Sequence, residues 1–577
     1  MCALQVPTLL LWKESGLVKA HYPLIVSAMD AGVSRMLTRR CTDVANRYCG
    51  ALDDMTYLIE PGSGPGLIGA CCTVYSCQES RYFRDASLLS YIHEACDMLL
   101  RVCHPNGTLD FLATNFYTPA TFEIQAFCRG YKNFVHYMQG TAEECAARDH
   151  MLKALALLAK GCLNGGFHTP NHRWVECAAL LMCHNIFGWK ELREKVDGYL
   201  SEGIDCDEYG EFTERSMGCY NPINVNSMLV MAEEGNLPQL EEYAQRNLEL
   251  TFQYCDGDGA IFTRNSRRQD KGEERVYPGH LWYYLYLWAG EKFGNLKYLK
   301  FAEEMFRSSV MEGRGVPAPL WLYLEKPQLK ALDVDLSGVA LPTSYHAFYP
   351  NSNILRVRKG DFSYTLLANN PDFLHVKFGK ATMTARMCSS FFAVAQFAPT
   401  KIAKTETGYR MTFRAHGEYK GLFPTPPASS DWFQMDHSQR PVLNPCDLDY
   451  TLDVEDQENG LTMRIRVDNT PHVPFKLEFV VPAGTRLETS QVILDTTAGG
   501  ELAIKQGDAR LENVETGCEV TVRGLFANHM YHKTMRGSVP QRKDAFSLYA
   551  TDWSPVNREI ALCFSHREHA RAISAPL

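Results

Sequence analysis

The sequence lacks long apolar runs and the short motifs of nucleotide chemistry. No stretch of about 18 or more uncharged apolar residues occurs, so we expect no membrane-spanning segment and no membrane partner. The motifs GxxxxGK(S/T), GxSxG, HExxH and a helix-opening GxGxxG are also absent. The glycine-rich stretch 62–69 has no lysine, so it does not predict a phosphate-binding loop. These absences give no support to nucleotide chemistry.

Positive charge and paired cysteines are also scarce. The formal net charge is −9, whereas a nucleic-acid-binding protein usually presents a basic face, so we expect no nucleic-acid partner. The 20 cysteines lack paired CxxC spacing, and most lie in apolar helical stretches. This pattern predicts buried thiols rather than disulfides or a metal cluster. Residues 1–15 do not resemble a secretory signal, and together these features favour a cytoplasmic protein.

The first part of the chain has the apolar spacing of helices. From residue 20 to about residue 325, apolar side chains recur at i, i+3, i+4 and i+7. No strict repeat of fixed period occurs, which weakens a solenoid. The successive helices could therefore pack as a bundle or as a closed α/α toroid. The predicted helices are 84–103, 121–138, 142–161, 173–187, 190–202, 222–234, 237–254, 278–292 and 295–312.

After residue 342 the apolar spacing changes to period two. Short alternating runs bounded by Gly, Pro, Asn and Asp predict antiparallel strands packed as a β-sandwich. We therefore expect a multi-domain α + β protein, with an (α/α) toroid or incomplete barrel at 1–335 and a sandwich at 336–577. Residues 400–450 are rich in Pro, Ser and Asp and predict long loops. The predicted strands lie within 352–359, 362–369, 373–379, 409–417, 461–469, 475–483, 518–526 and 546–552.

The stretch 164–188 is the most informative part of the helical half. A glycine-rich loop ends at Thr169-Pro170 and is followed by Asn171, His172 and Arg173 at a predicted helix start. Backbone N–H groups and the helix dipole favour an anion at such a position. A site for a negatively charged sugar has this composition, as does an ordinary polar helix start. Glu176 lies four residues after His172 and could share its helix face.

Three further loops of the helical half carry polar groups suited to chemistry. Residues 107–123 supply Asp110, Asn115 and Tyr117, and residues 207–228 supply Glu214 and Tyr220. Residues 256–288 supply charged and aromatic candidates: Arg267, Arg268, Asp270, His280 and Trp282. Arginine binds carboxylates in a planar, bidentate way, and aromatic rings can stack on sugars. In the sandwich, His346 and His375 are weaker candidates.

The Asn-His pair, the downstream tyrosine, the arginine-bearing loop and the two-part architecture resemble a known group of enzymes. They are similar to the heparinase II/III-like and alginate-lyase-like enzymes, and to glycoside hydrolase family 154, whose implied activity is β-glucuronidase. The lyase resemblance implies that Asn171 neutralises a uronate carboxylate, that His172 acts as base or binder, and that Tyr220 protonates the leaving oxygen. The closely spaced His and Asp residues that often open the lyase sandwich are missing.

A hydrolase would instead use two carboxylates. The candidates are Glu214 as acid and Asp270 as base, with Asp110 and Glu176 in reserve. Arg267 or Arg268 would hold the sugar carboxylate, while Asn171, Arg173, Asn115, Tyr117, His280 and Trp282 would bind substrate.

On this basis we expect exo-acting hydrolysis of a glucuronate linkage, in a small acidic oligosaccharide or glucuronide. The alternatives are β-elimination, a non-catalytic carbohydrate-binding protein, and a sugar isomerase or epimerase. No cofactor and no metal is implied. The sequence is compatible with a homo-oligomer.

Overall fold

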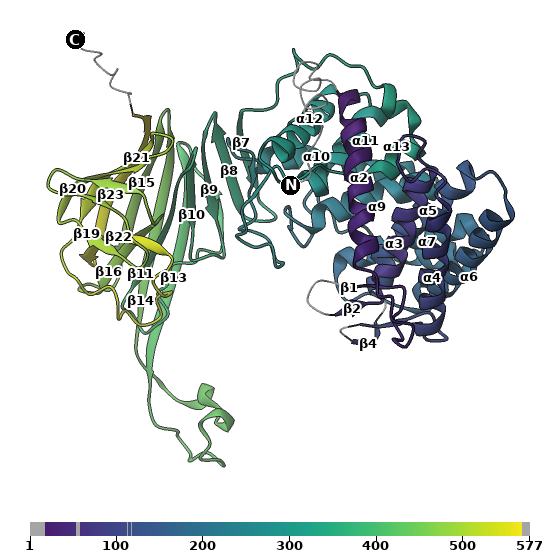
Figure 1. Cartoon of the computed structure of the whole chain (residues 1–577). Coiled ribbons are helices and arrows are strands. Elements are labelled where there is room, and N and C mark those ends of the chain that lie inside the picture. The colour runs from purple at the N-terminus through teal and green to yellow at the C-terminus, as the bar shows by residue number, and fades with distance from the viewer. Residues whose placement is uncertain (1–17, 54–57, 112, 117, 568–577) are drawn as a thin grey trace, which may run out of the picture. The chain divides into compact units, whose positions relative to one another are not determined.

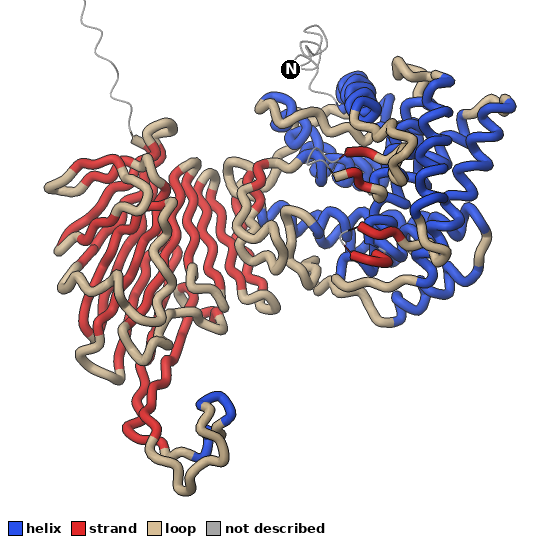
Figure 2. The backbone as a smooth tube through the Cα atoms, turned by 60° about the horizontal axis from the view of Figure 1, so that its bottom comes forward, coloured by secondary structure: helices blue, strands red, loops and turns tan. Residues whose placement is uncertain are grey.

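The computed structural model describes residues 18–53, 58–111, 113–116 and 118–567. It divides into two compact units, which Figures 1 and 2 show as a mainly helical part and a mainly strand part. The helical unit comprises Met1–Tyr254 and Ala260–Leu341, and the β unit comprises Cys255–Gly259 and Pro342–Leu577. The chain therefore enters the β unit for five residues, returns to the helical unit, and enters the β unit again after Leu341.

The helical unit alternates helices that are buried on nearly all sides with helices that have a polar face. Each of α3, α5, α7, α9 and α11 packs against the next in this series, and each is followed in sequence by a helix that packs against it. An all-round apolar helix lies inside and an amphipathic one lies outside, so the chain forms the predicted toroid. The helices are α2 (His21–Thr38), α3 (Ser63–Ser76), α4 (Ala86–Val102), α5 (Thr118–Tyr137), α6 (Ala142–Asn164), α7 (Pro170–Phe187), α8 (Lys190–Ser201), α9 (Tyr220–Glu234), α10 (Glu241–Tyr254), α11 (Gly279–Lys292), α12 (Leu296–Met311) and α13 (Leu320–Glu325).

The start and end of α7 follow local sequence rules. Pro170 occupies the first helical position, where its missing N–H would have no partner in any case. Gly188 ends the helix with a φ of 70°, a left-handed conformation that glycine adopts without steric cost. The helix begins three residues earlier than the predicted 173, so Asn171 and His172 lie inside its first turn.

Three pairs of short strands also belong to the helical unit. They are the ribbons β1 (Leu52–Asp53) with β2 (Ile59–Glu60), β3 (Leu109–Phe111) with β4 (Ala113–Phe116), and β5 (Ala260–Ile261) with β6 (Arg275–Val276). The apolar pattern did not predict them, because strands this short have no measurable period.

The β unit is built from two large sheets. One has the order β19-β22-β16-β11-β10-β9-β8-β7, and the other β12-β13-β14-β15-β23-β21-β20-β17-β18. All neighbours are antiparallel except β19 and β22, and apolar residues from both sheets share one core. The strands are β7 (Ser344–Tyr349), β8 (Ile354–Lys359), β9 (Phe362–Leu367), β10 (Leu374–Phe378), β11 (Ala381–Ser389), β12 (Ile402–Lys404), β13 (Gly408–Lys420), β14 (Val442–Gln457), β15 (Gly460–Asp468), β16 (Pro474–Pro482), β17 (Arg486–Glu488), β18 (Ile493–Asp495), β19 (Glu501–Ala503), β20 (Gln506–Asn513), β21 (Cys518–Phe526), β22 (Ala545–Trp553) and β23 (Val556–His566).

The prediction of long loops over 400–450 was wrong for residues 402–404, 408–420 and 442–450, which form strands. Strands β13 and β14 pair from Gly408↔Glu455 to Lys420↔Val442 and extend beyond the sheets as a two-stranded arm (Figure 1). Residues 400–401, 405–407 and 421–441 lie outside the strands, and 421–441 form the tip of this arm. Asp residues of these two strands pair with arginines on the neighbouring strand, as Asp449 does with Arg414.

Within the described residues, no helix is both long enough and apolar enough to cross a membrane.

Candidate functional site

Asn171 and Glu214 form the centre of a polar cluster in the helical unit. Asn171 lies in the first turn of α7 and is fully buried, and Glu214 lies in the loop before α9 and is 3% exposed. The Nδ2 atom of Asn171 donates to both carboxylate oxygens of Glu214, at 2.8 and 3.0 Å. The start of α7 and a loop 43 residues later in sequence are therefore joined by a buried amide–carboxylate contact.

Opposing effects act on the pKa of the Glu214 carboxyl. Burial raises the pKa of its carboxyl, while the hydrogen bond from Asn171 and the charge of Arg268 act to lower it. The Nε atom of Arg268 lies 3.4 Å from Glu214 Oε1. The backbone N–H of Arg267 also donates to the Glu214 carbonyl at 3.0 Å, which fixes the arginine-bearing loop against the Glu214 loop.

Tyr220 begins α9 beside the same arginine. The guanidinium carbon of Arg268 lies 4.8 Å from the centroid of the Tyr220 ring, within the range of a cation–π contact. Gln269 donates a hydrogen bond from Nε2 to the Tyr220 hydroxyl oxygen. Arg268 thus contacts both the carboxylate of Glu214 and the ring of Tyr220, and it stabilises negative charge near either group.

His172 is a neutral member of this cluster. Burial, together with the smaller effects of the nearby charges of His168 and Arg268, lowers the pKa of its imidazole to about 4. Its ring lies 4.7 Å from that of His168 and 5.3 Å edge-on from that of Phe122. At neutral pH the imidazole is uncharged and can accept a proton. Asn171, His172, Glu214, Tyr220 and Arg268 are hereafter called the polar cluster.

Asp270, the predicted general base, lies two residues after Arg268 in the arginine-bearing loop. It is fully buried, and its oxygens accept hydrogen bonds from the hydroxyls of Ser216 and Ser266 and from the N–H of Gly218. A carboxylate enclosed by three donors has no open side for water or substrate. The structure gives Asp270 the role of holding the 216–218 and 266–270 segments together.

Two predicted binding residues are occupied by contacts away from the polar cluster. Arg173 pairs with Glu202 at 3.0 Å and lies 3.5 Å from Asp205. Trp282 is fully buried, and its indole N–H donates to the Met217 carbonyl at 3.1 Å. The prediction that Trp282 offers a face to a sugar ring was wrong, because no face of this side chain is exposed.

The remaining predicted binding residues are spread over the helical unit. Asn115 is exposed in the β3–β4 ribbon and accepts a hydrogen bond from Thr108. Tyr117 lies outside the described residues. Arg267 is exposed beside Arg215, whose charge lowers the pKa of the Arg267 guanidinium.

The reserve carboxylates each have a local partner. Asp110 pairs with His104 at 2.7 Å, and Glu176 forms a buried ion pair with Lys195. Glu176 therefore does not act as the partner of His172 that its spacing suggested.

The sandwich histidines belong to the β unit. His375 is buried and lies 3.2 Å from the Thr384 hydroxyl, and His346 packs near Tyr409.

Sequence reasoning did not single out Glu123, on the second turn of α5. Burial, together with the smaller effect of the charge of Glu60, raises the pKa of its carboxyl to about 7. The carboxyl lies close to Gly66 of α3, where a Cβ would stand 2.5 Å from Glu123 Oε2. The neighbouring Phe122 contacts the His172 ring. A lone carboxylate in a sequence gives no sign of such a shift, which depends on which helix packs against it.

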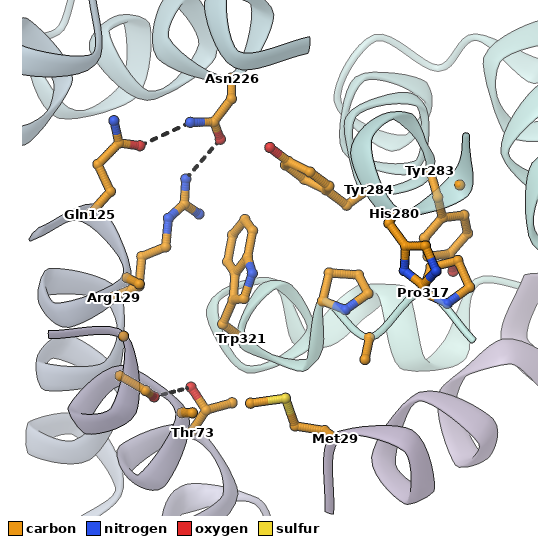
Figure 3. A pocket seen from close by; sticks show the side chains of 17 residues that line it. Met29, Thr73, Gln125, Arg129, Asn226, His280, Tyr283, Tyr284, Pro317 and Trp321 are labelled. Carbon is orange, nitrogen blue, oxygen red and sulfur yellow. Dashed lines mark hydrogen bonds between the residues drawn. The ribbon is translucent and has the colours of Figure 1, made fainter. Parts of the chain in front are cut away.

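A cavity of about 400 Å³ lies among the helices of the helical unit (Figure 3). Gln125 of α5 donates to the Val175 carbonyl of α7 at 3.2 Å, and Asn226 of α9 donates to Gln125 at 2.9 Å. His280 is the one predicted binding residue that lines this cavity. The lining residues are Met29, Gly66, Gly69, Ala70, Thr73, Gln125, Ala126, Arg129, Asn226, Gly279, His280, Tyr283, Tyr284, Pro317, Ala318, Pro319 and Trp321.

Comparison with known proteins yields matches among solved structures only. No protein-family model matches the chain, and no curated protein matches it. A chondroitinase AC lyase, whose structure includes oligosaccharide complexes, matches with a TM-score of 0.52 at 8% identity, over 95% of this chain and 82% of that chain. A chondroitin AC lyase mutant from Streptomyces coelicolor matches with a TM-score of 0.50 at 12% identity, over 94% and 79%.

A xanthan lyase from Paenibacillus matches with a TM-score of 0.51 at 10% identity, over 94% of this chain and 55% of that one, so this chain spans about half of that lyase. At these identities the likeness shows the fold alone, an α/α toroid followed by antiparallel β-sheets. The expected fold class is therefore confirmed. The three neighbours named above are lyases. Membership in glycoside hydrolase family 154 stays a prediction.

Proposed function

We propose that this protein is a carbohydrate-active enzyme that cleaves the glycosidic bond of a uronic acid by β-elimination. The observation that carries the proposal is the polar cluster, in which an amide and a neutral imidazole from α7, a phenol from α9 and a guanidinium from the loop between β5 and β6 meet. The lyase fold of the structural neighbours supports the same choice. The sequence had favoured hydrolysis, with elimination as the alternative, and this order is now reversed.

Elimination needs three functions, and the polar cluster can supply each of them. The substrate carboxylate must be neutralised so that the C5 proton becomes acidic, and Arg268, whose side chain is 27% exposed, provides a positive charge for this, while the buried amide of Asn171 holds the Glu214 carboxylate beside it. His172, uncharged at neutral pH, takes the C5 proton. Tyr220 gives its phenolic proton to the leaving oxygen as the C4–O bond breaks and the C4–C5 double bond forms.

Hydrolysis would require a second carboxylate facing Glu214. The predicted partner, Asp270, is enclosed by Ser216, Ser266 and Gly218. Glu214 itself has a raised pKa, which suits a proton donor, so hydrolysis is kept as an outcome that the experiment below can detect.

The test incubates the full-length protein with size-defined uronate oligosaccharides, including chondroitin, heparan and alginate fragments and aryl glucuronides. We expect products whose masses sum to that of the substrate and whose conjugated double bond absorbs in the ultraviolet. Products whose summed mass exceeds that of the substrate by one water would establish hydrolysis and overturn the proposal. No cleavage of any uronide would also overturn it.

The variant Tyr220→Phe removes the proposed proton donor and keeps the ring. We expect kcat to fall by about 10³-fold, with KM changed far less. Tyr243→Phe is a matched control, because the Tyr243 ring also lies 4.7 Å from an arginine guanidinium, that of Arg246, outside the polar cluster. Equal rates for the two variants would exclude the proposed role of Tyr220.

A further inference from the structure

The cavity in the helical unit has a hydrogen-bonding wall and an apolar wall. Its lining includes the apolar side chains of Pro317, Pro319 and Trp321 and the polar side chains of Arg129 and Asn226. Figure 3 shows Arg129 beside the Trp321 ring and Asn226 next to Arg129. A volume of about 400 Å³ lies within the usual range of small-molecule sites, roughly 300–1,000 Å³. The cavity therefore has the size for a small ligand.

Arg129 presents unused donors to this cavity. Its side chain is 6% exposed, and its guanidinium carbon lies 3.6 Å from the centre of the Trp321 ring. One nitrogen donates to Asn226 Oδ1 at 3.2 Å, and another lies 3.4 Å from a Glu325 oxygen. A guanidinium carries five N–H groups, and among the described residues the others have no partner. The 3.4 Å contact with Glu325 offsets the positive charge of Arg129 only in part.

The orientation of the Asn226 amide is fixed by its neighbours. Gln125 must donate with its amide nitrogen, because its partner is the Val175 carbonyl. Gln125 Oε1 therefore accepts from Asn226 Nδ2, which leaves Asn226 Oδ1 to accept from Arg129. This chain of hydrogen bonds holds the guanidinium in place before any ligand arrives, and preorganisation of this kind strengthens binding.

Tyr284 adds a second donor near the arginine. Its ring lies 5.6 Å edge-on from Trp321, and Figure 3 shows its hydroxyl directed toward the side that carries Asn226 and Arg129. Within the described part of the chain this hydroxyl has no hydrogen-bond partner. Burial raises its pKa to about 12, so it keeps its proton. At the edge of the cavity, His280 uses Nε2 toward the Arg314 carbonyl, which leaves Nδ1 to accept a hydrogen bond from a ligand hydroxyl.

We propose that this cavity binds a single anionic sugar ring, with the ring's carboxylate on Arg129 and Tyr284 and its apolar face on Trp321. The inference rests on the proposed function, because it identifies the ring as a uronic acid of the same substrate class. Asn226 lies six residues after Tyr220 on α9, roughly 9 Å along the helix axis, so the cavity and the polar cluster share a helix.

The binding test uses the full chain with D-glucuronate and D-glucose as probes, measured by calorimetry or ligand-observed NMR. We expect glucuronate to bind and glucose, which lacks the carboxylate, to bind at least tenfold more weakly. Tyr284→Phe keeps the ring and should weaken glucuronate binding by about tenfold, as expected for a lost hydrogen bond to a charged group. Ala318→Leu fills the cavity from its wall without removing a hydrogen bond, and it should weaken binding as well.

Variants of the polar cluster separate this proposal from the proposed function. Tyr220→Phe should lower kcat by about 10³-fold and leave glucuronate binding unchanged. If Arg268→Ala abolishes glucuronate binding while Tyr284→Phe and Ala318→Leu do not affect it, the probe binds at the polar cluster and the cavity proposal is wrong. If the cavity variants lose binding but no uronide is cleaved by the unaltered protein, the cavity proposal stands and the proposed function fails.

Discussion

The buried ionisable groups of the helical unit are shifted in opposite directions by one physical cause. Burial disfavours whichever form is charged, so it lowers the pKa of His172 to about 4 and raises that of Glu123 to about 7. Both groups are therefore uncharged over part of the pH range in which an exposed histidine or glutamate would be charged. Each shift leads to a prediction about pH.

His172 should remain an effective proton acceptor well below the pH at which an exposed histidine is protonated. We expect kcat/KM for a uronide substrate to show no loss attributable to His172 between pH 7 and about pH 5, with its acidic limb near the pKa of about 4. The pH profiles of the unaltered protein and of His172→Gln provide the measurement. An acidic limb near pH 6.5 that disappears in His172→Gln would show that the imidazole is not buried as described.

Glu123 should make the folded state less stable as pH rises. Because the pKa of its carboxyl is raised in the folded protein, the favourable contribution of the protonated form is complete below about pH 4.5 and is lost by about pH 7. Glu123→Gln mimics the protonated form, so it should be more stable than the unaltered protein by about 2 kcal/mol at pH 8 and nearly equal to it at pH 4. Urea unfolding at the two pH values measures this. A stability difference that does not change with pH would contradict the assigned shift.

At the scale of elements, close helix contacts depend on glycine. Gly161 of α6 packs against Gly107, and a Cβ on Gly161 would stand 2.3 Å from the Gly107 carbonyl oxygen. Helix propensity alone would make Gly161→Ala stabilising by about 1 kcal/mol. The contact reverses the sign, and we expect a loss of about 2 kcal/mol. Gly166→Ala, where a Cβ would meet nothing within 4 Å, is the control. Thermal unfolding followed by circular dichroism compares them, and equal midpoints would show that the backbone relaxes freely.

Helices with a visible apolar period could be predicted from the sequence, whereas α3, which is buried on nearly all sides, could not. Amphipathic helices such as α4 and α12 were predicted within two residues at each end, because one face is polar and the period is visible. Helix α3 was not predicted, since its residues from Leu67 to Ser76 are all buried and carry no alternation. Strands were found because short β-branched runs are bounded by turn residues, even where β9 is buried on both faces.

The polar cluster was predicted in part for the same reason. Asn171 and Tyr220 were predicted from helix starts, which leave a local sequence signal. The burial of Trp282 and the enclosure of Asp270 depend on which segments pack against them, and spacing along the chain does not contain that information. The cavity was missed because Arg129 and Trp321 come from segments nearly 200 residues apart.

At the scale of the whole molecule, the five-residue segment 255–259 supplies a buried ion pair to the β unit. Asp256 lies 2.8 Å from Arg356, whose side chain is 1% exposed, and it accepts a hydrogen bond from Ser363 at 2.8 Å. We expect Asp256→Asn to destabilise the protein by about 3 kcal/mol, because it leaves a buried guanidinium without its counter-charge.

Asp453→Asn is the matched control for that prediction. Asp453 pairs with Arg410 on an exposed ladder of β13 and β14, where the arginine side chain is 45% exposed. Its loss should cost less than about 1 kcal/mol. Comparable denaturation midpoints for the two variants would show that the buried Asp256 ion pair contributes no more to stability than the exposed Asp453 pair.

The detour of residues 255–259 also limits how this protein can be taken apart. A fragment that starts at Pro342 would lack Asp256, so Arg356 would have to be solvated or repacked in its interior. The β unit therefore cannot be exchanged as one continuous segment. Recombination at the single junction after Leu341 would give a graft with an unneutralised cation, whereas a graft that also transplanted the 255–259 excursion would keep its partner.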